Sequence, residues 1–339
     1  MHLRLKNFRN YTDFKVAFEE DINWIIGPNA SGKTNLLEAI HLISTGRSFR
    51  TPYLRELIQH GEKAFLIDLT FEKEGLKQQI RLYYDGERKS LRINNQEYTH
   101  FTPLFGTLPS TLFTPSDIML IEGGPKYRRR YLNVLLAQSD PLYIQHLLRY
   151  TRALKQRNQL LKQGALTSIG VWEHEMIRSA NYLMGERQRI LSIIAEKAAP
   201  LLKQLTPVRE ELSLKYQPSL LENDPQFFQK TRAKELKAGL TLYGPHLDEL
   251  SIEINGKSAK SFGSEGQKRS SVAALKIAEY QIMKEKMGTV LFGLDDFGAQ
   301  LDKERISSLK NILINLKPSI VTAPTALESQ EKAPILLSI

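Results

Sequence analysis

A glycine-rich segment, Gly27 to Thr34, constrains the fold of this chain more than any other stretch. It reads GPNASGKT and matches the pattern GxxxxGK(S/T) at every fixed position. Residues 22–26 before it are mostly apolar and predict a buried strand, and residues 35–43 after it carry apolar side chains at helical spacing. A strand, a glycine loop and a helix in this order favour an α/β fold in which backbone N–H groups of the loop face a phosphate.

The residue types in this loop suit a triphosphate and a metal ion. The two glycines let the backbone wrap tightly. Lys33 would reach the β- and γ-phosphates, and the Thr34 hydroxyl would bind Mg²⁺. The alternative is a glycine-rich turn that matches the pattern by chance.

Composition excludes several other classes of protein. The 339 residues include no cysteine, which excludes disulfides, thiol catalysis and cysteine-ligated zinc and suits a reducing cytoplasm. The chain is long enough for one large or two smaller domains. No apolar run approaches about 20 residues, so we expect no membrane span. The alternating start, Met1–Lys6, is typical of a strand and not of a signal peptide.

The order of the expected elements places a helical insertion inside an α/β domain. Residues 64–98 alternate with period two between turn signals and predict an antiparallel meander, preceded by an opening strand at 1–9 and its hairpin partner at 11–20. Helices are expected at 127–138, 141–163 and 171–202, the last one broken by Pro200. Then come strands at 212–216, 240–243, 250–254, 289–294 and 319–322, with helices at 266–286 and 303–315. We therefore predict a head made of residues 1–114 and 240–339, and an inserted lobe at 115–239.

The positive charge of the chain is concentrated in the insertion. The net charge is +10, and residues 125–240 alone hold twenty Lys and Arg against ten Asp and Glu. Residues 126–163 hold nine basic residues and one acid, Asp140. The helix at 141–163 is expected to bury a stripe and to expose its basic residues on the other side; the stripe comprises Ile144, Leu147, Leu148, Leu154 and Leu161. A polyanion such as DNA is the expected partner of the basic surface, although some arginines could instead cap helices or pair with the other lobe.

Two further segments complete a possible nucleotide site. Asp295 and Asp296 follow the apolar strand at 289–294, which would carry a carboxylate to the sheet edge where the phosphate loop opens. Asp295 would bind Mg²⁺, and Asp296 could orient or deprotonate the attacking water. The segment SEGQ at Ser264–Gln267 begins a long helix and could bind a second anion, for example across a two-fold dimer, or could simply cap the helix through Ser264.

The order of these motifs resembles the ABC-type ATPase heads of the SMC and DNA-repair class, and within it the RecF family of bacterial recombination mediators. The resemblance spans nearly the whole chain. The segments that carry it are LKNFRNY (5–11), GPNASGKTNLLEAI (27–40), GRSFRT (46–51), FTPSDIMLIEGGPKYRRRYLN (113–133), YTRALKQRNQLLK (150–162), GPHLDEL (244–250), FGSEGQKRS (262–270) and LDDFGAQLD (294–302), and FRN, RSFRT, RRR and LKQRNQLLK within them separate this family from other ABC-type heads. It implies an α/β fold, an ABC-type, SMC-like P-loop ATPase head with a mixed sheet and an inserted, mainly helical lobe.

The resemblance also implies residue roles. The nucleotide loop would comprise Gly27, Pro28, Asn29, Ala30, Ser31, Gly32, Lys33, Thr34 and Asn35, with Arg9 near the phosphates or the base. Lys33, Asp295 and Asp296 would be catalytic, and Thr34 and Asp295 would hold Mg²⁺. Ser264, Gly266 and Gln267 would cap the γ-phosphate of ATP in trans, and Asp302 would lie at the dimer interface. The expected DNA contacts are Arg128, Arg129, Arg130, Arg152, Lys155 and Arg157.

For the whole protein, the resemblance implies an ATP-dependent homodimer on DNA at single-strand/double-strand junctions of gapped duplexes. It would act with RecO- and RecR-like mediators to load RecA recombinase, with slow ATP hydrolysis for release, in the cytoplasm and associated with the nucleoid. The sequence departs from the family pattern at Asn133, Leu247, Ala299, Gln300 and Ala323. Two alternatives remain open: a scaffold that binds ATP with little catalysis, and a P-loop kinase acting on a small acceptor.

Overall fold

The computed structural model describes residues 1–206, 208, 210–220, 224–298, 303–325 and 335–337. The chain forms two compact units. Unit 1 comprises residues 1–117, 204–207 and 276–339, and unit 2 comprises residues 118–203 and 208–275. The sequence placed the end of the insertion at residue 239, whereas unit 2 extends to Leu275 and includes the Ser264–Gln267 segment.

Unit 1 contains two sheets of different type. The first is antiparallel with strand order β2-β1-β4-β5-β6-β7, and its strands are β1 (His2–Phe8), β2 (Tyr11–Ala17), β4 (Phe65–Lys73), β5 (Leu76–Tyr84), β6 (Lys89–Ile93) and β7 (Gln96–Tyr98). The predicted meander is therefore confirmed. The second sheet is parallel with order β14-β3-β13-β12-β8, and its strands are β14 (Ile335–Leu336), β3 (Ile22–Ile26), β13 (Ser319–Ala323), β12 (Leu291–Leu294) and β8 (Ser110–Phe113).

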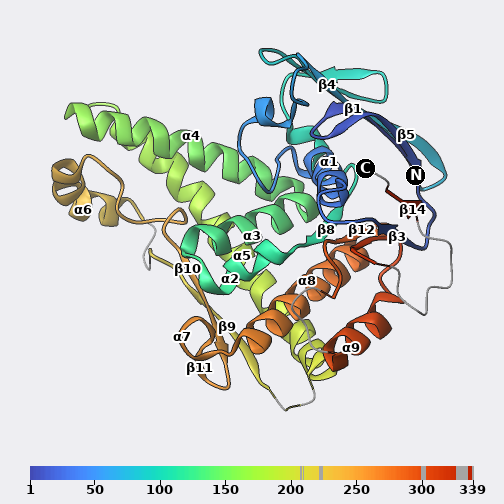
Figure 1. Ribbon diagram of the computed structural model, residues 1–339. Helices are drawn as coiled ribbons and strands as arrows, with labels where there is room; N and C mark the ends of the chain where they lie inside the picture. Colours follow the sequence, from blue (N-terminus) through green and yellow to red (C-terminus); the bar gives the residue numbers. More distant parts are fainter. Residues whose placement is uncertain (207, 209, 221–223, 299–302, 326–334, 338–339) are drawn as a thin grey trace. The chain divides into compact units, whose positions relative to one another are not determined.

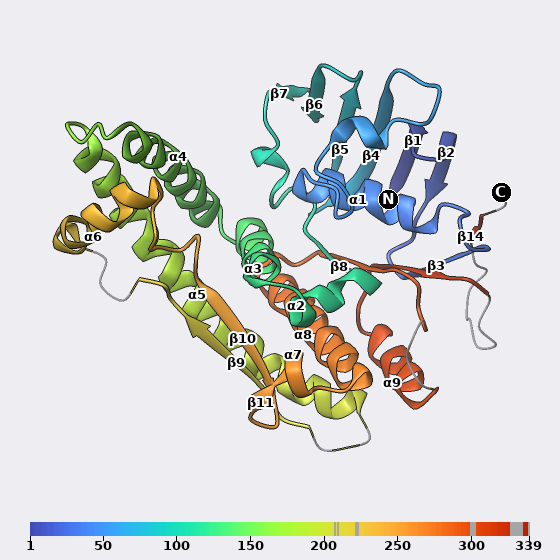
Figure 2. The ribbon, with the colours of Figure 1, turned by 60° about the vertical axis from the view of Figure 1, so that its left-hand side comes forward.

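Helix α1 (Lys33–Thr45) lies between the two sheets of unit 1 (Figures 1 and 2). Its Leu36, Leu37 and Ile40 are buried in one core with side chains of β1, β4 and β5 from the first sheet and of β13 from the second. The second half of α8 (Glu265–Met287) and α9 (Lys303–Leu313) cover the opposite face of the parallel sheet. Short helical turns lie at η1 (Leu54–Leu57), η2 (Thr102–Leu104) and η3 (Pro115–Ile118).

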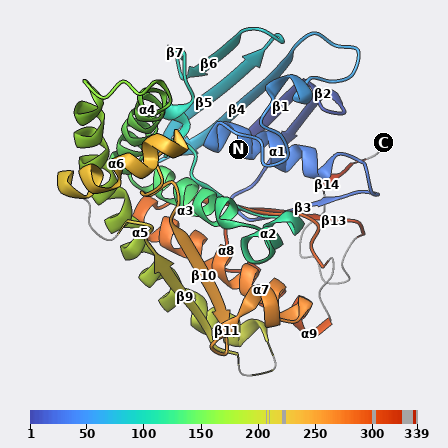
Figure 3. The same ribbon diagram turned by 90° about the vertical axis from the view of Figure 1, so that its left-hand side faces the viewer.

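Unit 2 is mainly helical and has one small antiparallel sheet. Its helices are α2 (Met119–Glu122), α3 (Pro125–Ser139), α4 (Pro141–Gln163), α5 (Ile169–Leu205), α6 (Pro225–Ala238), α7 (Ala259–Phe262) and the start of α8. The sheet has the order β11-β10-β9, with β9 (Leu212–Gln217), β10 (Glu249–Ile254) and β11 (Lys257–Ser258). Within this unit, α4, the first part of α5 and α6 gather at one end, and the sheet and α7 lie at the other (Figure 3).

Helix α4 has the predicted bounds but buries a different side. Its buried residues are Tyr143, Tyr150, Ala153, Arg157 and Leu161, whereas Leu148 of the predicted stripe is 52% exposed. The prediction was wrong because it counted Arg157 as a surface residue. Leu161 of the predicted stripe is buried, but the rest of the buried face includes Arg157 and not Leu148.

Two other predictions are corrected, and two elements were missed. Helix α5 continues through Pro200 to Leu205, because Leu201, Leu202 and Leu205 are buried and this packing compensates for the backbone hydrogen bond that proline cannot donate. No strand forms at 240–243, where the chain leaves the left-handed Gly239 cap of α6. Helix α6 and strand β14 were not predicted. Among the described residues, no helix is long and apolar enough to cross a bilayer.

Candidate nucleotide-binding site

Three parallel strands bring the predicted nucleotide residues to one edge of the sheet in unit 1. Strand β3 pairs with β13, and β13 pairs with β12. Because the strands are parallel, the loop after β3, the end of β13 and the aspartates after β12 meet at the carboxyl edge, the usual ligand edge of an open α/β sheet. Thr34 and Asp295, which are 261 positions apart in the sequence, thereby become neighbours.

The centre of the site is a set of hydrogen bonds on Asp295. The Thr34 hydroxyl lies 2.9 Å from Asp295 Oδ2 and 3.1 Å from Oδ1. From β13, Thr322 Oγ1 donates to Asp295 Oδ1 at 2.9 Å and accepts from the backbone N–H of Asp296 at 2.8 Å. Thr322 therefore fixes both aspartates. It is a site residue that the sequence analysis missed, and its only signal was a hydroxyl on the strand between β3 and β12.

The loop itself is shaped to surround an anion. Gly32 has φ 102°, and a Cβ there would lie 2.6 Å from Asn10 Nδ2 and 2.9 Å from the Tyr11 hydroxyl, so this position requires glycine. The Lys33 ammonium group is held by the carbonyl oxygens of Gly27 and Pro28 at 2.6 and 2.8 Å. The hydroxyl of Ser31 is buried without a hydrogen-bond partner. An unsatisfied donor and an ammonium group held only by carbonyls are what a phosphate oxygen would complete.

The residues present also fit a magnesium ion. Thr34 and Asp295 supply a hydroxyl and a carboxylate, the hard oxygen ligands that Mg²⁺ prefers. Burial raises the pKa of Asp295, and the charge of Asp296 acts in the same direction. Hydrogen bonds from Thr322 and Thr34 and the charge of Lys33 oppose this rise. A carboxylate that is costly to ionise alone gains from a cation beside it.

A polar network lies behind the loop and includes Arg9. The Arg9 guanidinium donates to both oxygens of the fully buried Glu38 carboxylate, at 2.8 and 2.9 Å, and to the carbonyl of Glu56. The side chain of Asn35 donates to Asn10 and accepts from Arg50. Arg9 thus links α1 to η1 inside the protein, and its contact with a nucleotide stays a prediction. Sequence reasoning did not identify Asn10, Glu38 or Arg50 as parts of this network.

The Ser264–Gln267 segment lies in unit 2 and forms a reciprocal helix cap. The backbone N–H of Ser264 donates to Gln267 Oε1 at 2.8 Å, and the Gln267 N–H donates to Ser264 Oγ at 3.3 Å. This is the capping box that stabilises helix starts. The capping alternative is thereby observed, and the contacts of Ser264, Gly266 and Gln267 with a second subunit's nucleotide stay a prediction.

The predicted DNA-binding residues divide into buried and exposed groups. Arg157 is 0% exposed, and Arg128 is 9% exposed and bonded to Glu249 and two carbonyl groups. Their assignment to DNA is corrected, because their donors are used inside unit 2. Arg129 is half-buried and donates to the carbonyl of Asp248. The others, Arg130, Arg152 and Lys155, are exposed.

The positions at which the sequence departs from the family pattern have different surroundings. Asn133 accepts from the Tyr143 hydroxyl and from Arg187, so an amide is well accommodated there. Leu247 is 44% exposed, and Ala323 is buried in β13. Ala299, Gln300 and Asp302 lie outside the described residues. The role of Asp302 at a dimer interface therefore stays a prediction.

Comparison with known proteins supports this picture across nearly the whole chain. The family described as RecF/RecN/SMC N terminal domain matches residues 1–327. The chain is 38% identical over 315 residues to the DNA replication and repair protein RecF of Protochlamydia amoebophila, covering 89% of this chain and 88% of the relative. It is 36% identical over 337 residues to the protein of the same description from Chlamydia caviae, covering 95% and 91%.

Solved structures agree with the sequence relatives. The chain superposes with TM-score 0.89 and 28% identity, over 97% of its length and 92% of the other chain, on a structure described as the recombination mediator protein RecF-ATP in the RecFOR pathway. A Pyrococcus furiosus Smc head domain gives TM-score 0.58 at 17% identity, covering 96% and 89%, a likeness of fold alone. The fold is thus that of the ABC-type ATPase heads shared by RecF and SMC proteins, and the chain belongs to the RecF family.

Proposed function

We propose that this chain is an ATP-dependent DNA clamp of recombinational repair. ATP binding would drive two copies together on DNA at single-strand/double-strand junctions, help to load recombinase, and be followed by slow hydrolysis for release. The observation that carries the proposal is the contact of Thr34 with Asp295, which joins the phosphate loop to the metal-binding carboxylate. The relatives named DNA replication and repair protein, and the RecF-ATP structure of the RecFOR pathway, support it.

Each side chain of the site has a defined task in this proposal. Lys33 would turn from the carbonyl groups of Gly27 and Pro28 to the phosphates, and Thr34 and Asp295 would hold Mg²⁺. The ion, when bound, would supply charge neutralisation on the triphosphate. Asp296, whose backbone N–H is held by Thr322, would orient the attacking water.

The second half of the site would come from another copy of the chain. Ser264, Gly266 and Gln267 of that copy would open their capping box and direct the freed donors at the γ-phosphate. In a two-fold dimer each subunit gives one loop and receives one helix start, so two nucleotides are enclosed. We infer that a single subunit binds ATP and that only the dimer hydrolyses it.

DNA would be bound mainly through its backbone. The exposed Arg130, Arg152 and Lys155 of unit 2 can contact phosphates without reading bases, so binding should depend steeply on salt and little on sequence. RecO- and RecR-like mediators and RecA recombinase would be the protein partners, in keeping with the pathway named for the solved relative.

The proposal is tested by ATP turnover and DNA retention of Lys33→Arg and Ser264→Arg variants, measured singly and mixed. Each variant alone should lose ATP-dependent dimerisation and hydrolysis. An equal mixture should recover roughly a quarter of the wild-type sites, because each mixed dimer contains one site with neither substitution. A parallel sample, in which wild-type protein is added to the mixture at the same total concentration, controls for the exchange of subunits between dimers.

Three results would contradict parts of this proposal. No recovery in the mixture would place both halves of the site in one subunit. Binding of DNA that is the same with and without ATP would exclude the clamp. ATP binding with no turnover in any dimer would favour the scaffold alternative.

A further inference from the structure

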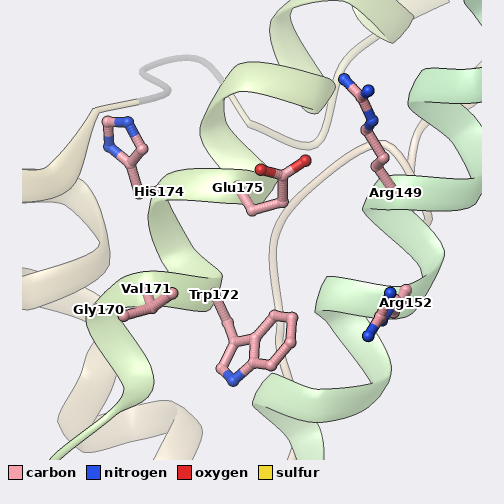
Figure 4. Close-up of a pocket in the computed structure, with 7 residues that line it drawn as sticks. All are labelled: Arg149, Arg152, Gly170, Val171, Trp172, His174 and Glu175. Carbon is pink, nitrogen blue, oxygen red and sulfur yellow. The ribbon is translucent and has the colours of Figure 1, made fainter.

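An open groove of about 790 Å³ lies in unit 2, between α4 and the first turns of α5, and none of the nucleotide residues described above lines it. Figure 4 shows two arginines on the α4 side and an indole, an imidazole and a carboxylate on the α5 side. The lining residues are Arg149, Arg152, Gly170, Val171, Trp172, His174 and Glu175. None of them except Arg152 was assigned a role by the sequence.

Neither arginine of this groove is held in an ion pair within the part of the chain that the structure describes, although the Glu175 carboxylate also lines the groove. Arg149 and Arg152 are exposed and make neither an ion pair nor a hydrogen bond with any residue that the structure describes. They lie one helical turn apart, and the exposed Lys155 lies one further turn along α4. With a rise of 1.5 Å per residue, this row of three cations spans about 9 Å. A row of unpaired cations of this length suits a chain of evenly spaced anions.

The aromatic residue of the groove is also without an aromatic partner. Trp172 is half-buried, projects from α5 toward the turn of α4 that carries Arg152 (Figure 4), and makes no ring contact with another aromatic side chain of the described residues. The preceding residue, Val171, also lines the groove and is 70% exposed. A half-buried indole that stacks on no other aromatic side chain of the described residues can serve as a stacking platform for a base.

We propose that this groove binds single-stranded nucleic acid, with one unpaired base stacked on Trp172 and the neighbouring phosphates on Arg152 and Lys155. The combination of an aromatic platform with a cationic row is how proteins bind single strands without reading their sequence. Glu175, the one acid in the lining, disfavours phosphate next to Arg149 and so directs the backbone toward Arg152.

The row of cations distinguishes a nucleic acid from an acidic peptide. A peptide would need an acidic side chain near every position of the row, whereas a phosphodiester backbone carries a charge at every nucleotide. This inference rests on the proposed DNA clamp. It extends that proposal by giving the single strand of the junction a site of its own.

Tryptophan fluorescence tests the contact directly, because the chain has only two tryptophans. Trp24 is buried in unit 1 against Phe297, so a stacked base should quench Trp172 alone. Titration of the full-length protein with oligothymidylate should quench wild-type emission, and Trp172→Phe should bind the oligonucleotide but lose the quenching. Absence of quenching in the wild type would overturn the proposal.

Affinity variants separate stacking from charge. Trp172→Ala should weaken oligothymidylate binding about tenfold and leave blunt duplex binding unchanged. Arg152→Ala with Lys155→Ala should lower the slope of log K against log salt by about 0.7 for each cation removed. Lys215→Ala is the matched control, since Lys215 is an exposed lysine of the same unit that pairs with Glu253. Equal loss of single-strand affinity in Lys215→Ala would reduce the effect to net charge and overturn the site.

Two outcomes separate this inference from the clamp. If Trp172→Ala keeps ATP-dependent duplex retention and loses oligothymidylate, the groove is supported as a distinct site. If oligothymidylate binds Trp172→Ala and the wild type alike while the wild type still clamps duplex DNA with ATP, the groove proposal fails and the clamp stands. Quenching of Trp172 by an acidic peptide but not by oligothymidylate would assign the groove to a protein partner and overturn our proposal.

Discussion

Arg157 and Arg149 lie about two turns apart on the same helix, α4, and have opposite surroundings. Arg157 is fully buried and binds Glu173, Glu235 and the Thr241 hydroxyl, whereas Arg149 is exposed and has no partner among the described residues. A count of the charged residues in the sequence treats these two arginines alike. The comparison teaches that the basic residues of one segment fall into two groups. Some are paired inside the protein and stabilise it, and others are exposed and remain available to a ligand.

The largest effect should follow from removing a structural arginine. Arg157→Ala leaves the Glu173 and Glu235 carboxylates buried with too few donors, and we expect it to lower the free energy of unfolding of unit 2 by about 3–5 kcal/mol. Urea denaturation followed by Trp172 fluorescence, with Trp24 replaced by Phe in every protein, measures it. Arg152→Ala is the control and should change stability by less than about 0.5 kcal/mol. Equal effects would remove the distinction between the two groups.

An intermediate effect is expected where a buried arginine pairs with a partly exposed carboxylate. Arg128 binds both oxygens of Glu249, and Arg128→Ala should cost about 2–3 kcal/mol at pH 7. Burial pushes the pKa of Glu249 up, but hydrogen bonds from Arg128 and the Leu250 N–H outweigh burial, so the pKa lies below its usual value.

The lowered pKa gives this second prediction a pH dependence. The stabilisation from the Arg128–Glu249 pair is present above the unfolded-state pKa of about 4.3 and is lost as the pH falls through the folded-state pKa. The difference between wild type and Arg128→Ala should therefore shrink below about pH 4. A difference that stays constant from pH 7 to pH 3 would show that the carbonyl contacts of Arg128, and not its ion pair, dominate.

The nucleotide site lies between these extremes, because its groups are paired with each other until a ligand arrives. Thr322→Val keeps the shape of the side chain and removes the hydroxyl that joins Asp295 to Asp296, so we expect a loss of about 1–2 kcal/mol in stability. Mg²⁺-dependent ATP affinity should also fall, which isothermal titration can measure. Thr322→Ser restores the hydroxyl and should recover most of the affinity. An affinity unchanged in Thr322→Val would mean that Thr34 alone positions Asp295.

The smallest effect on stability should come from the cationic row. Arg149→Ala combined with Arg152→Ala should leave urea denaturation within about 0.5 kcal/mol of the wild type, because neither exposed side chain bonds to any residue in the described part of the chain. Fluorescence anisotropy of labelled oligothymidylate should nevertheless report weaker binding. A large loss of stability would move these arginines into the structural group.

Local patterns explain which parts of the fold could be predicted. The strand, loop and helix around Gly27–Thr34, the meander and the bounds of α4 depend on periodicity and turn residues within short windows, and these are confirmed. The contact of Asp295 with Thr34 was predictable because a strand pattern fixes the end at which each residue emerges.

The partners of buried charges were not predictable from the sequence. Arg157 finds Glu173 at sixteen positions and Glu235 at seventy-eight positions along the chain, and no local signal distinguishes it from Arg152 on the same helix. The same reason hides the Arg9–Glu38 pair and the two hydrogen bonds of Thr322. Pro200 inside α5 shows the converse, since buried leucines after it override a strong local signal.

The capping box of Ser264 and Gln267 gives the proposed dimer a chemical threshold. Because these two residues already satisfy each other, they gain from a partner subunit only if it offers an acceptor stronger than a hydroxyl and an amide. A terminal phosphate meets that condition, and a diphosphate that ends one group earlier would leave the donors unused. Opening the cap costs about 1 kcal/mol per helix. Because a dimer contains two such caps, the preference for ATP over the diphosphate applies at both sites. In this proposal the helix cap does more than stabilise the start of α8. It makes the dimer respond to ATP and not to ADP.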